Sequence, residues 1–418
     1  MHRLNLIVIL LSVLYTLEPN ANFAQSARVI ATTAAAWSHS GELIAFVGAD
    51  FYERDRIPEG YITIYDPLRK ATVLALTVEY GGYTSVAWSP DDTRIAVSGY
   101  DQTVRVFDAA HGTLVATLPE HRAIVTSVDW SPDGNYIVSA APMDPRVILW
   151  DARTYEVTMT LNVSDPWAVA FSPDGASLAI GGIGGLMLIP MNDLAGVSDV
   201  SNLSQYRVAD GYLGAVAWSA DSSKIAFGNH TFRSLSDPEG RTDAYLWVFD
   251  VSSGEEILSA VTGLWGIYGN AIRGGVVATH SIDGTVQVWS LKSDKLVRIA
   301  AHSGTAEFSA KLDLSNYGAR LAYGRSYVAD VNQTQETRQE GELAFDVVVP
   351  DPSLERLNGI AEACVPESAA RDPFVADSLA EVGAFVERLD ALPDDAIPPA
   401  CRADLLAVAE ALMAGAGQ

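Results

Sequence analysis

One short phrase recurs five times along the chain: an apolar pair, an aromatic residue, a serine and then a turn. Successive aromatic residues of these phrases lie 51, 42, 41 and 47 residues apart; they are Trp37, Trp88, Trp130, Phe171 and Trp218. A repeat of roughly 40–45 residues is typical of a β-propeller blade, whereas the helical tetratricopeptide repeat takes about 34. The spacing therefore predicts a β-propeller, and it favours a binding function over a catalytic one.

Each repeat follows one plan of short strands and tight turns. In the second repeat, the predicted strands span residues 85–88, 94–98, 103–107 and 114–118. Pro, Asp and Gly residues fall between them, as they do between the strands of all-β proteins. Two further, degenerate repeats begin near Asn270 and Phe308. The sequence thus predicts an all-β fold, a seven-bladed β-propeller of four-stranded antiparallel blades over residues 27–350.

Two motifs point to a known family. The turn after the aromatic residue reads Ser-Pro-Asp-Gly or close to it, and an aromatic–aspartate pair ends the third strand of most repeats. These pairs are Tyr65-Asp66, Phe107-Asp108, Trp150-Asp151, Phe249-Asp250 and Phe345-Asp346. Together the motifs make residues 27–350 resemble the WD-repeat β-propellers. The resemblance implies a buried hydrogen-bond network of histidine, serine, aspartate and tryptophan, and the residues in the matching positions are His121, Ser139, Asp144 and Trp150.

The closure of the ring has two possible forms. The resemblance implies that a strand from about residues 25–30 completes the last blade. Few residues separate this stretch from the inner strand expected at 33–37. Either the closing strand is short and its turn abrupt, or the last blade has only three strands.

The first 26 residues have the composition of a secretory signal peptide. Arg3 precedes an apolar run of 14 residues, 4–17, and small residues follow at Ala24, Ser26 and Ala27. The run is too short to cross a bilayer comfortably. We therefore expect cleavage after Ala24 or Ser26 and export to the periplasm, the cell envelope or the extracellular space, with no membrane span remaining. An uncleaved anchor is the alternative.

Residues 351–418 change to a helical period and predict a small, acidic α-helical segment at the C-terminus. This segment holds both cysteines of the chain, Cys364 and Cys401. An even number of cysteines in an exported chain favours a disulfide, and two buried free thiols are the alternative. We expect the helices to cap the last blade or to act as a second docking element.

Charge and motif content restrict the function. The formal net charge of −25 disfavours nucleic acid as a partner, because phosphate binding needs a basic surface. No two histidines have metal-ligand spacing, and no Gly-x-Ser-x-Gly nucleophile motif occurs. The aspartates of the repeat turns fit hydrogen bonds to their own backbone better than calcium binding. We therefore expect no catalytic residue, no cofactor and no metal.

Three repeats carry long insertions between their second and third strands, within residues 48–60, 228–244 and 324–341. Such connections emerge on one face of a propeller, and the first and last blades are neighbours in a closed ring. The insertions contain aromatic and arginine residues, which are common anchors of protein interfaces: Phe51, Tyr52, Arg54, Arg56, Phe232, Arg233 and Tyr327. Ordinary drift in loop length is the alternative explanation of the insertions.

We therefore expect a monomeric, non-catalytic scaffold that binds a protein or peptide on this long-loop face. An enzyme or small-molecule binder that uses the central channel is the alternative. The inner strands begin with small, apolar residues in four repeats, which disfavours a polar channel.

Overall fold

The computed structural model describes most of the chain. The described residues are 28–51, 58–79, 81–192, 194, 205–206, 212–230, 244–262, 266–281, 285–291, 297–302, 311–329, 344–348, 354–365, 376, 378, 381–393 and 396–415. The predicted signal peptide lies outside these residues.

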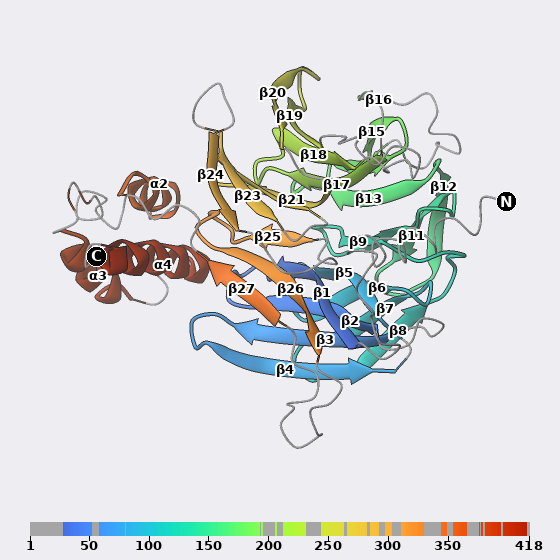
Figure 1. The fold of residues 1–418 in the computed structure, drawn as a ribbon, viewed down its shortest axis with the longest axis horizontal. Helices are drawn as coiled ribbons and strands as arrows, with labels where there is room; N and C mark the ends of the chain where they lie inside the picture. The colour runs from blue at the N-terminus through green and yellow to red at the C-terminus, as the bar shows by residue number, and fades with distance from the viewer. Residues whose placement is uncertain are drawn as a thin grey trace, which may run out of the picture.

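The described strands form six antiparallel sheets that surround a common centre (Figure 1). Five of the sheets have four strands each. Their strands are β5 (Tyr83–Trp88), β6 (Arg94–Gly99), β7 (Val104–Asp108) and β8 (Leu114–Leu118); β9 (Ser127–Trp130), β10 (Tyr136–Ala140), β11 (Arg146–Asp151) and β12 (Val157–Asn162); β13 (Pro166–Phe171), β14 (Ser177–Gly182), β15 (Gly185–Pro190) and β16 (Gln205–Tyr206); β17 (Tyr212–Trp218), β18 (Lys224–His230), β19 (Tyr245–Asp250) and β20 (Glu256–Val261); and β21 (Ile267–Arg273), β22 (Val276–Ser281), β23 (Val286–Ser290) and β24 (Val297–His302).

The sixth sheet has seven strands and contains both ends of the propeller. It consists of β1 (Arg28–Trp37), β2 (Ile44–Phe51), β3 (Glu59–Asp66), β4 (Ala71–Val78), β25 (Leu312–Leu314), β26 (Leu321–Ala329) and β27 (Ala344–Val348). The prediction of seven separate blades was therefore wrong, because the described strands form six sheets. The strands expected to make a seventh blade join the first one.

The joint between the two ends is the long strand β1. Arg28–Ala31 pairs with Ser326–Ala329 of β26, and from Val29 onwards β1 also pairs with β2. The sequence suggested a closing strand and an inner strand separated by a turn, but the two form one continuous strand with a register shift between Thr32 and Ala34. Because β1 is hydrogen-bonded on both sides, it joins β2–β4 and β25–β27 into one sheet.

Burial follows the position of a strand within its sheet. In β6, five of six residues are buried, whereas in the outer strand β8 only Leu118 is buried. Aromatic residues of the recurring phrase also tie neighbouring sheets together: Trp88 Nε1 donates to the carbonyl oxygen of Ala36 at 3.0 Å, and Trp218 Nε1 to that of Ala170 at 3.1 Å. Apolar clusters likewise contain residues of neighbouring sheets, as Val138 and Leu178 do in one of them.

The turns of the recurring phrase use their serine and aspartate in the same way in four sheets. The serine hydroxyl donates to the aspartate two residues later at 2.5–2.6 Å, in the pairs Ser89–Asp91, Ser131–Asp133, Ser172–Asp174 and Ser219–Asp221. Gly134 and Gly175 follow with φ of 74° and 70°, a left-handed conformation that favours glycine. Each aspartate also accepts from the backbone N–H two residues later, as the sequence predicts; the donors are Thr93, Asn135, Ala176 and Ser223.

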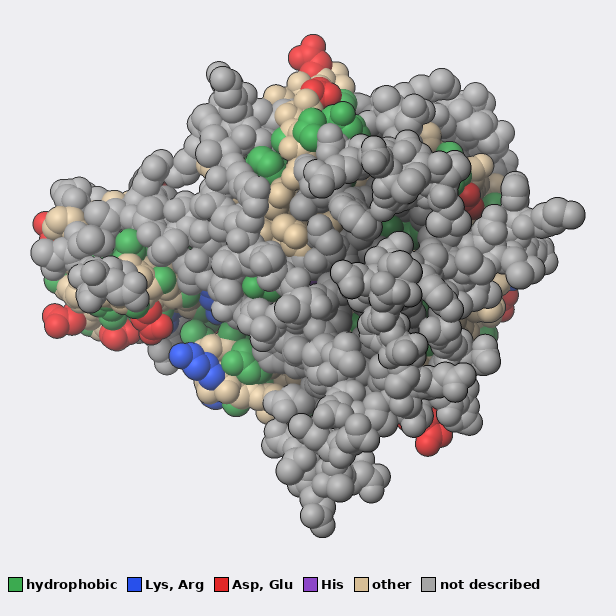
Figure 2. All heavy atoms as spheres, in the orientation of Figure 1, with side chains coloured by type: hydrophobic (Ala, Val, Ile, Leu, Met, Phe, Trp, Pro, Cys, Tyr) green, Lys and Arg blue, Asp and Glu red, His purple; other side chains and the backbone are tan. Residues whose placement is uncertain are grey.

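Three helices follow the propeller: α2 (Leu354–Cys364), α3 (Val382–Asp390) and α4 (Pro399–Gly415). They stand outside the ring of sheets in Figure 1 and share their own apolar core, which includes Leu357, Phe385 and Leu405. A disulfide joins Cys364 to Cys401, with a Cα–Cα distance of 5.9 Å. Acidic side chains lie along one edge of this segment in Figure 2. The exposed acidic residues here are Glu381, which precedes α3, and Glu387 and Asp390 within α3.

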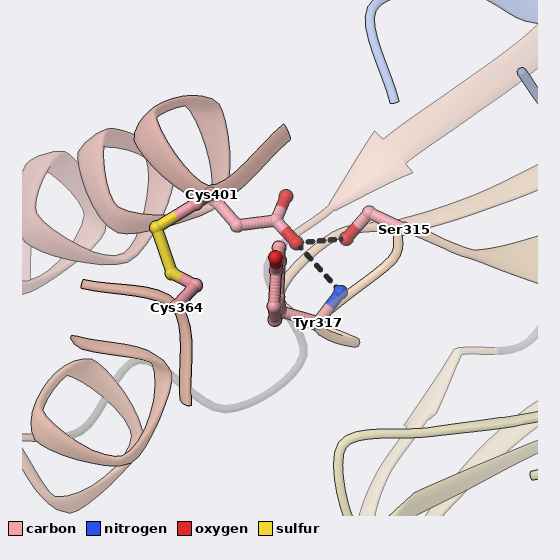
Figure 3. The surroundings of a disulfide bond; sticks show 5 residues. Ser315, Tyr317, Cys364 and Cys401 are labelled. Carbon is pink, nitrogen blue, oxygen red and sulfur yellow. Dashed lines mark hydrogen bonds between the residues drawn. A yellow bond between two sulfur atoms is a disulfide. The ribbon is translucent and has the colours of Figure 1, made fainter. Parts of the chain in front are cut away.

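The helical segment docks on the turn between β25 and β26. Asp404 of α4 is fully buried there and accepts hydrogen bonds from Ser315 Oγ at 2.7 Å, from the backbone N–H of Tyr317 at 3.2 Å and from Arg320 Nε at 2.7 Å. Figure 3 shows the bonds from Ser315 and Tyr317 beside the disulfide. Arg320 also lies 4.3 Å above the ring of Trp37. One carboxylate thus fixes the helices to the joined sheet.

Two findings bear on general function classes. No helix in the described part of the chain is long and apolar enough to span a membrane. Among the same residues, no group of three or more His, Cys, Asp or Glu side chains is placed to hold a metal ion.

Candidate functional site

The residues expected to bind a partner lie at or beyond the edge of the described structure. Tyr52, Arg54, Arg56, Phe232 and Arg233 lie outside the described residues. Phe51 ends β2 and Tyr327 lies in β26, and only their backbone positions are described. These two positions come together through β1, because Phe51 pairs with Val29 and Tyr327 pairs with the next residue, Ile30. The strand ends that carry the first and third insertions therefore lie on either side of β1, one strand apart.

His121, Ser139, Asp144 and Trp150 form one buried chain of hydrogen bonds. Trp150 Nε1 donates to Ser139 Oγ at 2.9 Å, Ser139 Oγ lies 2.8 Å from His121 Nε2, and His121 Nδ1 lies 3.0 Å from Asp144 Oδ2. Burial lowers the pKa of His121, which favours the neutral imidazole. Because the Asp144 carboxylate can only accept, the neutral imidazole donates from Nδ1 to Asp144, and its Nε2 accepts from the Ser139 hydroxyl.

The same chain has the order of a hydrolase triad, serine then histidine then carboxylate. Ser139 is fully buried, however, and its oxygen already accepts a hydrogen bond from Trp150. A nucleophile must reach substrate, and this one has no access to it. The network therefore holds β10, β11 and the segment before β9 together and has no catalytic geometry.

The innermost strands line an open cavity of about 330 Å³ at the centre of the propeller. Its wall is built from the innermost strands of the propeller, which are β1, β5, β9, β13, β17, β21 and β25. Most of this wall is small and apolar, as the sequence indicates. Six charged or titratable residues also line it: His39, Asp129, Tyr268, Arg273, Lys311 and Asp313. The wall thus combines an apolar surface with a few titratable groups, which the starts of the inner strands do not indicate.

The two aspartates of the channel bind the backbone of the next innermost strand. Asp129 Oδ2 accepts from the N–H of Phe171 at 2.7 Å, and Asp313 Oδ2 accepts from the N–H of Trp37 at 2.9 Å. The second bond crosses from the end of the propeller to its beginning. Burial raises the pKa of both carboxyl groups. Each aspartate thus helps to hold the ring closed and also presents a carboxylate to the cavity.

Lys311 reaches across the channel to sheets that are not its neighbours in sequence. Its ammonium group donates to Ser85 Oγ at 2.7 Å and to Ser127 Oγ at 3.0 Å. Burial lowers the pKa of Lys311 to about 8. The signals for these residues were present in the sequence: Asp129 replaces the alanine of the recurring phrase, and Lys311 and Asp313 alternate with Leu312 before the last strands.

The shifted pKa of Lys311 predicts a pH dependence of stability. Between about pH 8 and the ordinary lysine value of 10.5, the unfolded chain holds this proton while the folded protein has released it. The free energy of unfolding contributed by this group therefore rises with pH across that window. Urea unfolding of the wild type and of Lys311→Met across this pH range measures the effect, and the difference between the two proteins cancels other groups. A difference that stays flat would show that the lysine is not shifted.

The fold is that of a β-propeller, and comparison with known proteins identifies the family of its repeats. Residues 76–108 and 112–151 match the WD40 family model, described as "WD domain, G-beta repeat". A guanine nucleotide-binding protein subunit beta from Oryza sativa subsp. japonica is 28% identical over 186 residues, which cover 42% of this chain and 46% of that protein. THO complex subunit 3 from Arabidopsis thaliana is 34% identical over 112 residues, 25% of this chain and 36% of that protein. The matched part thus spans less than half of these curated relatives.

Solved structures share the fold. The structure of U3-55K superposes with a TM-score of 0.58 at 13% identity, covering 78% of this chain and 99% of that one. A chain of the mitotic checkpoint complex superposes with a TM-score of 0.54 at 18% identity, covering 71% and 89%. At such identities the likeness concerns the fold alone. The chain therefore contains WD40 repeats in an all-β propeller and has WD-repeat relatives.

Proposed function

We propose that the protein is an exported, non-catalytic scaffold that binds a protein or peptide through its long-loop face. The observation that carries the proposal is the pairing of β1 with both β2 and β26, which places Phe51 and Tyr327 on the two strands that flank the start of β1. Two of the three insertions therefore start from one place on the molecule. Their aromatic and arginine residues are of the kinds that anchor protein interfaces.

The chemistry of the described residues is consistent with a scaffold. The Ser–His–Asp arrangement is buried and serves packing. The channel aspartates and Lys311 are engaged by hydrogen bonds between sheets. The relatives are WD-repeat proteins, and one of them is named as a subunit of the THO complex. Subunits of assemblies act through protein contacts, and we extend that mode of action to this chain.

The binding face is tested by exchanging the loops. A partner is captured from the native host with the mature protein, purified, and its dissociation constant measured for three forms. The three forms are the mature protein, a loop-exchange form and a control. In the loop-exchange form, residues 52–57, 231–243 and 330–343 are replaced by Gly/Ser sequences of equal length. In the control, the exposed β-turn residues Ala110 and His111 are replaced by Gly and Ser. We expect the loop exchange to weaken binding at least about tenfold, and the control to leave it unchanged.

Equal affinity of all three folded forms would contradict a site on the long-loop face. Unchanged thermal unfolding of the exchanged form shows that the propeller is intact, so that a loss of affinity reports on the loops. Export is tested separately by N-terminal sequencing of the protein from its host. Mature chains beginning just after Ala24 or Ser26 support export with cleavage, whereas chains that retain residues 1–20 and are found in the cytoplasm contradict export.

A further inference from the structure

The channel cavity contains opposite charges that do not touch each other. Lys311 and Asp129 both line it, and each has hydrogen-bond partners: two serine hydroxyls for Lys311 and the N–H of Phe171 for Asp129. Within the described part of the chain, neither forms an ion pair. An ammonium group has three donors and a carboxylate has two oxygens. Each group therefore keeps capacity for a further partner of opposite charge.

A second observation comes from an uncharged residue of the same wall. Asn270 is 92% buried, since only 8% of its surface is exposed, and it lines the cavity. Its Nδ2 donates to the carbonyl oxygen of Ala226 at 3.0 Å, but its buried Oδ1 has no partner among the described residues. A buried acceptor without a donor costs about 1–3 kcal/mol. Asn270 therefore adds a polar group to the wall of the cavity.

The remainder of the wall favours an apolar body. The innermost strands contribute alanine at successive equivalent positions, among them Ala36, Ala87, Ala170 and Ala217. A cavity of about 330 Å³ is at the small end of ligand sites, which range from roughly 300 to 1,000 Å³. It has room for a molecule of the size of one amino acid.

We propose that the central channel binds a small aliphatic α-amino acid as a zwitterion. Its carboxylate meets the ammonium group of Lys311, its ammonium group meets the carboxylate of Asp129, and its side chain packs on the alanines. A zwitterion pairs with Lys311 and Asp129 at once, whereas a ligand with one charge leaves one of these two groups without an ionic partner. Unpaired charge in a partly desolvated site is unfavourable. This site is separate from the long-loop face and goes beyond the proposed function.

The experiment compares three ligands of one shape by isothermal titration calorimetry on the full mature protein. L-leucine carries both charges, 4-methylpentanoate lacks the ammonium group, and 3-methylbutylamine lacks the carboxylate. We expect L-leucine to bind at one site, at least about tenfold more tightly than either analogue. Equal affinity for L-leucine and one analogue, or no binding of L-leucine at millimolar concentration, would overturn the proposal.

Two variants separate ligand binding from folding. Asp129→Asn keeps an oxygen that accepts from the N–H of Phe171, so the contact between sheets remains, but it removes the negative charge. Asp151→Asn removes a carboxylate from a turn outside the channel. We expect Asp129→Asn to weaken L-leucine binding at least about tenfold, with thermal unfolding close to the wild type, and Asp151→Asn to leave binding unchanged. Undiminished binding by folded Asp129→Asn would overturn the assignment.

Discussion

Replacing Asp404 with alanine is expected to detach the helical segment and to lower the free energy of unfolding by about 3–5 kcal/mol. The carboxylate is fully buried and accepts from Arg320, Ser315 and the N–H of Tyr317. Its removal leaves the guanidinium of Arg320, itself only 4% exposed, without its charged partner. A buried, unpaired charge is among the most costly defects in a folded protein. Urea unfolding measures the loss, and limited proteolysis shows whether α4 becomes accessible.

A matched control is available on the same helix. Glu410 of α4 is exposed, so Glu410→Ala removes the same charge from the segment without touching the joint. We expect it to change the free energy of unfolding by less than about 0.5 kcal/mol. Similar losses for the two variants would show that the net charge of the helices, and not the buried pair, governs their attachment.

Replacing Trp150 with alanine is expected to cost about 3–5 kcal/mol of the free energy of unfolding. Trp150 is one of the largest fully buried side chains of the protein. The substitution opens a cavity between neighbouring sheets and removes the donor that Ser139 accepts from. Chemical unfolding followed by circular dichroism measures the change.

Trp150→Phe separates packing from hydrogen bonding. Phe107 occupies the equivalent position of the second repeat and is buried there, so a phenylalanine ring is compatible with this place in a blade. The variant keeps most of the apolar surface and loses only the bond to Ser139. We therefore expect a smaller loss, about 1–3 kcal/mol. A loss as large as that of the alanine variant would mean that the hydrogen bond dominates the packing.

The repeating part of the fold could be predicted because its signals are local. A serine and an aspartate two residues apart define a turn wherever they occur, as Ser131 and Asp133 do, and the aromatic residue before them marks an inner strand. His121 and Asp144 are set by their distance from Trp150 within one repeat. Cys364 and Cys401 are the only two cysteines of the sequence, so only one disulfide pairing within the chain is possible.

The parts that the sequence did not reveal depend on residues far apart in the chain. Whether β1 is one strand or two is decided by pairing with β26, about three hundred residues later. The joint to α4 combines Asp404 with Arg320, and neither residue has a recognisable motif. Lys311 bonds Ser85 and Ser127 only because the ring brings the last innermost strand opposite the second and third. Local periodicity contains no information on such contacts.

The central claim is that the partner binds the long-loop face, where the insertions after β2 and β26 begin. Hydroxyl-radical footprinting of the complex with the captured partner tests this claim most directly. We predict protection of Tyr52, Phe232 and Tyr327, with no change at His39 and Asn316 beside the channel and the helical segment. Protection confined to His39, Asn316 and α4, with the three aromatic residues left reactive, would contradict this account and place the partner on the opposite face.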